Sequence, residues 1–178
     1  MQIIKTKQDE AYKALTKFGY KTKLAAPRLQ KVVISSGTGS VMKKDKEKNK
    51  LILDRLTRIT GQRPTLRAAK KSVASFKVRQ GDPIGVSVTL RGARMYHFLD
   101  KLINIAIPRT KDFRGIDRKN VDSVGNITIG IKEHTIFPET TDEDLRDVFG
   151  FAITIVTTAK NYEEATSFFE YLGIPFKK

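Results

Sequence analysis

The chain has 178 residues, with 34 Lys and Arg against 19 Asp and Glu, so its formal net charge is +15. It has no Cys and only two His, which excludes disulfides, thiolate zinc sites and cysteine nucleophiles and disfavours an imidazole-based site. The length fits one domain spanning residues 1–178, and the basic charge points to a polyanionic partner, nucleic acid ahead of an anionic membrane.

The net positive charge belongs entirely to the first half of the chain. Residues 1–89 hold 21 bases and 6 acids, whereas residues 90–178 hold 13 of each. This polarity favours a docking face over the alternative that Lys merely solubilises the surface. The N-terminus lacks the apolar core of a signal peptide, and no apolar run approaches the roughly 18 residues of a membrane span. We therefore expect a soluble, cytoplasmic protein.

In the first half, the spacing of apolar residues predicts a helix over Asp9–Phe18, with Gly19 as its C-cap. A stretch rich in β-branched residues predicts a strand at Leu29–Ser35. The charge run Lys43–Lys50 opens a second helix, which ends at Gly61. The spacing of Ile52, Leu56 and Ile59 places them on one apolar face of this helix.

Two further strands follow closely, at Pro64–Ala69 and Ile84–Arg91. The second is the clearest in the chain, because its apolar residues alternate strictly with Gly85, Ser87, Thr89 and Arg91. The connection Lys70–Pro83 is long enough to project, so the pair predicts a long hairpin.

The second half predicts a helix at Gly92–Ile107, strands at Ile127–Ile131 and Phe151–Thr157, and a last helix from Asn161 to Leu172. Interleaved helices and closely spaced strands indicate an α+β fold. We expect a mostly antiparallel sheet with helices on one face and a long projecting hairpin loop.

The segment Arg63–Arg79 is the most specific electrostatic feature. It contains six bases and no acid: Arg63, Arg67, Lys70, Lys71, Lys77 and Arg79. Basic side chains neutralise phosphates and release counterions, while Ser72, Ser75 and Gln62 could add hydrogen bonds. Phe76 could stack on a base, or it could anchor the loop in the core and leave the charges merely solvated.

Two other surfaces are candidates for contact. The polar face of Ile84–Arg91 could be an RNA platform or an ordinary solvated face, and the residues leave both interpretations open. Arg109, Lys111 and Arg114, beside Phe113, form a second basic patch.

No feature of the sequence indicates catalysis, a metal site or a cofactor. Gly37-Thr38-Gly39 lacks the residues that complete a phosphate loop or a dinucleotide fingerprint. The acidic residues of Glu139–Asp147 lack a calcium-loop pattern and are expected to be a solvated turn or a helix start. Two alternatives to a specific RNA-binding protein are a nucleoid-type protein that binds nucleic acids generally and an RNA-processing enzyme that uses this acidic cluster with a metal.

Several longer motifs resemble one family. They are Ala68–Met95, Pro108–Gly115, Phe137–Glu139, Ile153–Lys160 and the terminal Pro175-Phe176. Together they are similar to large-subunit ribosomal proteins of universal family five, bacterial type. The likeness spans nearly the whole chain, in the order and at the length of that family.

The resemblance implies a non-enzymatic protein of the cytoplasmic ribosome. It would bind 5S rRNA and attach it in the central protuberance, contact peptidyl-site tRNA and help form a bridge between the subunits. Its expected partners are these two RNAs, 23S rRNA as a further candidate, and neighbouring ribosomal proteins that include one in the small-subunit head. No membrane, homo-oligomer, metal or cofactor is expected.

The resemblance also assigns residues. The 5S rRNA contacts fall on Ser35, Gln62, Thr89 and Arg91, and the acid-free run adds Arg63. The loop that reaches tRNA carries Lys70, Lys71, Ser72, Ser75, Phe76, Lys77 and Arg79, while Arg109, Lys111 and Arg114 would meet a bridge partner or RNA. The chain departs from the family at Ser35, where Asn is usual, and at Val121–Asn126, where Phe-Asp-Gly-x-Gly-Asn is usual.

Overall fold

The computed structural model describes residues 3–39, 47–111, 113–140 and 148–177. The chain divides into two compact units. The first comprises Met1–Val32, Leu90–Ile129 and Ile153–Lys178, and the second comprises Val33–Thr89 and Gly130–Ala152. Organisation as a single domain over residues 1–178 stays a prediction.

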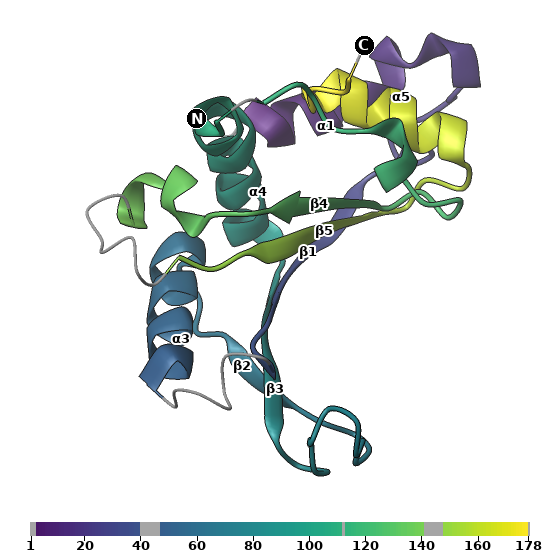
Figure 1. Ribbon diagram of the computed structural model, residues 1–178. Coiled ribbons are helices and arrows are strands. Elements are labelled where there is room, and N and C mark those ends of the chain that lie inside the picture. The colour runs from purple at the N-terminus through teal and green to yellow at the C-terminus, as the bar shows by residue number, and fades with distance from the viewer. Residues whose placement is uncertain (1–2, 40–46, 112, 141–147, 178) are drawn as a thin grey trace. The chain divides into compact units, whose positions relative to one another are not determined.

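Five strands form one sheet in the order β2-β3-β1-β5-β4 (Figure 1). Their bounds are β1 Leu29–Gly37, β2 Thr65–Ala68, β3 Pro83–Leu90, β4 Ile127–Ile131 and β5 Phe151–Thr157. Every predicted strand is therefore present: β4 and β5 have the predicted bounds, and the bounds of the other three are shifted by a residue or two. The predicted α+β class and the antiparallel sheet are confirmed.

The strands show why these segments form a sheet. In β4, Ile127, Ile129 and Ile131 are buried while Thr128 and Gly130 are exposed. The same alternation runs along β5. Because neighbouring side chains of a strand point to opposite faces, this pattern gives each strand one apolar, buried face and one open face of small and polar residues.

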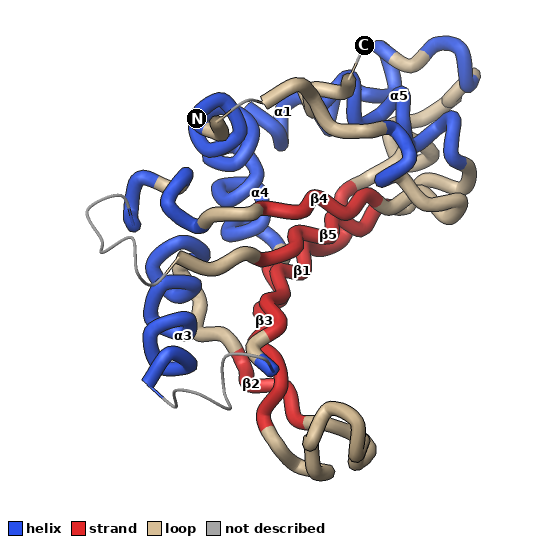
Figure 2. The backbone as a smooth tube through the Cα atoms, in the orientation of Figure 1, coloured by secondary structure: helices blue, strands red, loops and turns tan. Residues whose placement is uncertain are grey.

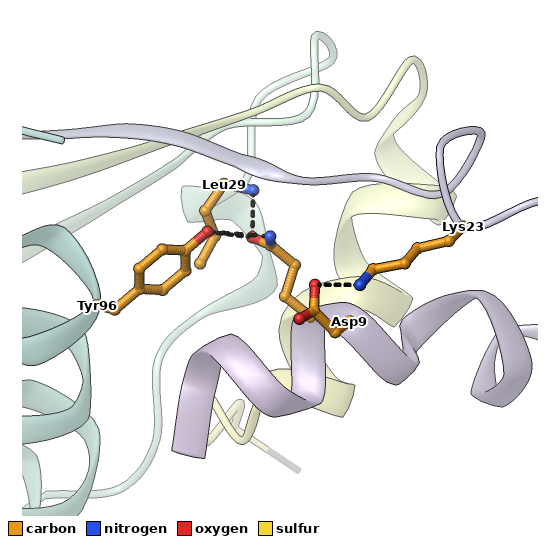
Figure 3. Close-up of polar contacts among 5 residues, drawn as sticks. Asp9, Lys23, Leu29 and Tyr96 are labelled. Atoms are coloured by element: carbon orange, nitrogen blue, oxygen red, sulfur yellow. Dashed lines mark hydrogen bonds and ion pairs between the residues drawn. The ribbon is translucent and has the colours of Figure 1, made fainter. Parts of the chain in front are cut away.

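In the first unit, α1 (Ile3–Ala14) lies against both α4 (Gly92–Lys101) and α5 (Tyr162–Leu172) (Figure 1). Polar contacts hold this arrangement together. Gln8 of α1 donates from Nε2 to the hydroxyl of Tyr96 at 3.0 Å and accepts the backbone N–H of Leu29 at 2.9 Å (Figure 3). Its side chain thus joins α1 to α4 and to the start of β1.

The predicted helix over Asp9–Phe18 is wrong in its bounds. The α-helix ends at Ala14, because Leu15 has φ −90° and ψ 51°, and only a short 3-10 turn, Thr16–Phe18, follows. Gly19 does cap that turn, with φ 62°. By contrast, the helix predicted over Gly92–Ile107 is helical throughout, although it widens to a π-helical turn at Leu102–Ala106.

In the second unit, α3 (Glu47–Thr60) has the predicted apolar face. Ile52, Leu56 and Ile59 are 3%, 0% and 1% exposed. His134 is buried and stacks on Phe149, with 4.4 Å between ring centroids.

The segment Val121–Asn126, which departs from the family pattern, still forms a closed turn. The Asp122 carboxylate accepts the backbone N–H groups of Val124 and Asn126 at 3.1 and 2.6 Å. Slight burial acts to raise the pKa of Asp122, but these hydrogen bonds outweigh it and hold the pKa below its usual value. Asp122, which the family pattern also has, therefore closes the turn despite the departures at Val121 and Ser123.

Candidate nucleic-acid interface

The end of α3 places Gln62. Gly61, at φ 68°, turns the chain out of the helix. The Thr60 hydroxyl donates to the Leu56 carbonyl at 2.6 Å and lies 3.3 Å from the Gln62 N–H, which it can accept. The Gln62 side chain then donates from Nε2 to the Thr89 carbonyl at 3.2 Å. Two residues predicted as RNA contacts, 27 positions apart in the sequence, are thereby brought together.

Ser35 and Arg63 complete this group within the second unit. Both side chains are exposed, Ser35 on β1 and Arg63 just before the buried Pro64. Thr89 is half-exposed near the end of β3. Neither Ser35 nor Arg63 has a side-chain partner among the described residues, so a hydroxyl and a guanidinium are left available to a ligand.

Arg91 belongs to the first unit and directly precedes α4. Its backbone is extended, with φ −140° and ψ 165°, and its side chain is exposed with no partner in the described part of the chain. Gly92 follows at φ 58° and begins the helix. Since Arg91 is separated from Thr89 by one residue, the chain itself keeps its backbone near the end of β3.

The polar face predicted for β3 is only partly free. Ser87 is 8% exposed, and its hydroxyl oxygen accepts a hydrogen bond from Arg67 Nε at 2.6 Å. Ser87 is therefore neither solvated nor open to RNA, although both interpretations left open for this face require exposed side chains. In the sequence, Arg67 is only one of the charges of the acid-free run. Its position two residues after Thr65 does place both side chains on one face of β2.

The connection between β2 and β3 is a hairpin loop that folds back on itself (Figure 2) and is held by backbone hydrogen bonds. Backbone hydrogen bonds join Ala69 N–H to the Asp82 carbonyl at 2.8 Å and Val73 N–H to the Val78 carbonyl at 2.9 Å. Lys77 closes the tip with φ 51°, a left-handed conformation that costs a non-glycine residue about 1–2 kcal/mol. Backbone hydrogen bonds thus hold the predicted loop together, and its tip is strained at Lys77.

Most side chains of the hairpin are exposed, whereas its backbone is hydrogen-bonded. Ser72 accepts the Gln80 N–H at 2.9 Å, so its oxygen serves the fold. Phe76 is 69% exposed, which rules out the alternative that it anchors the loop in the core. Exposed side chains also include Lys70, Lys71, Ser75, Lys77 and Arg79.

The second basic patch lies in the first unit. Arg109, Lys111 and Arg114 are exposed, and Phe113 is 38% exposed. Ile116 N–H donates to the Pro175 carbonyl at 2.8 Å, which fastens this segment to the C-terminal residues. Gly115, at φ 98°, lies so close to them that a Cβ there would be 2.6 Å from the Lys177 nitrogen. These contacts hold the backbone that follows Arg114 in place.

The structure bears on a metal site and on the acidic cluster only in the part of the chain that it describes. No group of three or more His, Asp or Glu side chains lies close enough to hold a metal ion in that part of the chain. The acidic residues Asp142, Glu143, Asp144 and Asp147 lie outside the described residues. Within the described ranges, no helix is long and apolar enough to cross a membrane.

Comparisons with known proteins agree over nearly the whole chain. Residues 23–79 match the family model described as ribosomal protein L5, and residues 83–176 match a second model, which describes the C-terminus of the same ribosomal family. The chain is 49% identical over 164 residues to the large ribosomal subunit protein uL5 of Carboxydothermus hydrogenoformans. That alignment covers 92% of this chain and 91% of the relative.

Proposed function

The chain belongs to the ribosomal protein L5 family, and from this premise we propose that it binds 5S rRNA and attaches it in the central protuberance. As a member of the family it is a non-enzymatic constituent of the large subunit of the cytoplasmic ribosome. The proposal extends to contact with peptidyl-site tRNA and to a bridge with a protein of the small-subunit head.

The observation that carries the 5S rRNA proposal is the arrangement around the end of β3. Gln62 is bonded to the backbone of Thr89, Ser35 and Arg63 present unpartnered side chains within the described residues, and Arg91 follows two residues later. Hydroxyl and amide groups suit ribose and base edges, and guanidinium groups suit phosphates. A side chain that is held in place, as Gln62 is, can help to recognise a particular RNA shape, which a generally basic surface cannot.

The hairpin supports the tRNA contact for a different reason. Its exposed Lys and Arg side chains and the exposed ring of Phe76 combine phosphate neutralisation with a stacking surface. The patch of Arg109, Lys111 and Arg114 is our candidate for the bridge or for a further RNA contact such as 23S rRNA.

Replacing Arg91 with Ala tests the 5S rRNA site. We expect binding to 5S rRNA to weaken by about 1–3 kcal/mol, as for loss of a charged donor that faces RNA. The measurement is a filter-binding titration at physiological salt. Lys119→Ala is the matched control, because Lys119 is exposed and its loss changes the net charge equally. Equal affinities for the two variants would contradict the role of Arg91.

A further inference from the structure

We infer that Arg67, held in place by Ser87, is an additional phosphate-binding residue on the open face of the sheet. This inference rests on the proposed binding of 5S rRNA and extends it. None of the residues assigned above to 5S rRNA includes this pair, and Ser87 acts through Arg67, which makes it a positioning residue.

The register of β2 and β3 places the pair. Thr65 lies opposite Ser87 and Arg67 lies opposite Gly85, so these four residues share one face. Gly85 has no side chain, and a Cβ built there would lie 3.9 Å from the Arg67 Cβ. Because Gly85 has no side chain, nothing at this position of β3 blocks the aliphatic part of the Arg67 side chain on its way to Ser87.

The hydrogen bond leaves the useful part of Arg67 available. Its Nε–H is donated to Ser87 Oγ at 2.6 Å, whereas the two terminal nitrogens have no partner among the described residues. Arg67 is exposed, while Ser87 beneath it is 8% exposed. The guanidinium therefore has its orientation set from one side and four N–H donors free on the other.

Arg67 differs from other arginines of the chain in its partner, which explains why we assign a phosphate to it. Arg58 and Arg118 each pair with a carboxylate, Asp54 and Glu170 respectively. Arg67 is held instead by a neutral hydroxyl, in a run of the chain without an acid from Arg63 to Arg79. Its full charge is thus available to an anion, and a planar guanidinium fits the two oxygens of a phosphodiester.

Fixing the side chain in advance should also favour binding. A free arginine loses rotamer freedom when it grips a ligand, and a partner that already restricts it reduces that loss. Because β2 is an edge strand whose four residues are all exposed, an RNA backbone can reach Arg67 without rearrangement of the fold.

A double-mutant cycle on the full chain tests the inference, with 5S rRNA as the probe. We expect Arg67→Ala to weaken binding roughly tenfold and to lower the slope of log affinity against log salt by about one. Ser87→Ala should weaken binding about two- to threefold, and Ser87→Thr, which keeps the hydroxyl, should restore it. The double variant should bind like Arg67→Ala alone, since Ser87 acts only through Arg67.

Two results would overturn the inference. One is wild-type affinity and salt slope for Arg67→Ala, and the other is an additive loss in the double variant. The melting curve of Arg67→Ala should match that of the wild type because Arg67 is exposed, and melting curves of the Ser87 variants, whose side chain is 8% exposed, separate a loss of folding from a loss of binding. If Arg91→Ala weakens binding while Arg67→Ala does not, the inference fails alone; if neither weakens it, the proposed 5S rRNA site fails as well.

Discussion

Two regions hold their functional groups in opposite ways: the C-terminal end of β3 and the hairpin that precedes β3. Around Thr89, side chains are tied to neighbours: Gln62 to the Thr89 carbonyl and Arg67 to the Ser87 hydroxyl. In the hairpin, the backbone is tied by the bonds between Val73 and Val78, while the exposed Lys side chains and Phe76 are left free. The end of β3 presents hydrogen-bond donors that are held in place. The hairpin presents exposed, charged side chains on a hydrogen-bonded backbone.

This difference separates two kinds of recognition. Fixed donors distinguish one RNA shape from another, because only a matching surface satisfies them. Free cations on a projecting frame supply affinity for any phosphate within reach, with little dependence on sequence. The comparison therefore predicts that variants of the two regions affect different RNAs.

The largest effect that separates the regions should come from the hairpin tip. We expect Lys77→Gly combined with Arg79→Ala to reduce tRNA retention on assembled ribosomes roughly tenfold, through the loss of two phosphate contacts. Gly accepts the left-handed backbone of Lys77 without strain, so the tip keeps its shape while the charge is removed. Binding of the same variant to 5S rRNA should stay within about twofold of wild type. An equal loss for both RNAs would show that the hairpin does not act separately from the end of β3.

A smaller effect should distinguish the frame from the charges it carries. Ser72→Ala removes the acceptor of the Gln80 N–H, and we expect the hairpin to open more easily by about 0.5–1 kcal/mol. Hydrogen exchange of the Val73 and Val78 amides measures this opening. Ser75→Ala is the matched control, because the exposed Ser75 makes no hydrogen bond with the described residues. If both variants exchange alike, the Ser72 contact does not hold the hairpin.

The same comparison shows what sequence could predict. The alternation along Ile84–Arg91 predicted β3, and the spacing of Ile52, Leu56 and Ile59 predicted α3, because local periodicity reports directly which face is buried. The short spacing between Pro64–Ala69 and Ile84–Arg91 likewise predicted the hairpin, and the binding role inferred from its acid-free run stays a prediction. These features depend on neighbouring residues alone.

Features that depend on pairing could not be predicted in this way. The bond from Gln62 to Thr89 spans 27 positions, and the contact of Arg67 with Ser87 depends on the register of β2 against β3. All four residues of β2 are exposed, so no pattern of burial marks that register. The left-handed backbone of Lys77 could not be predicted from the sequence either, since Lys seldom adopts positive φ.

The most direct test of the central claim compares two nucleic acids. Wild-type protein is titrated with 5S rRNA and with duplex DNA of equal length across a range of salt concentrations. Fixed donors at the end of β3 predict at least roughly a hundredfold preference for 5S rRNA at physiological salt, kept as salt rises. Equal affinities with the same salt slope would contradict the claim and favour a protein that binds nucleic acids through charge alone.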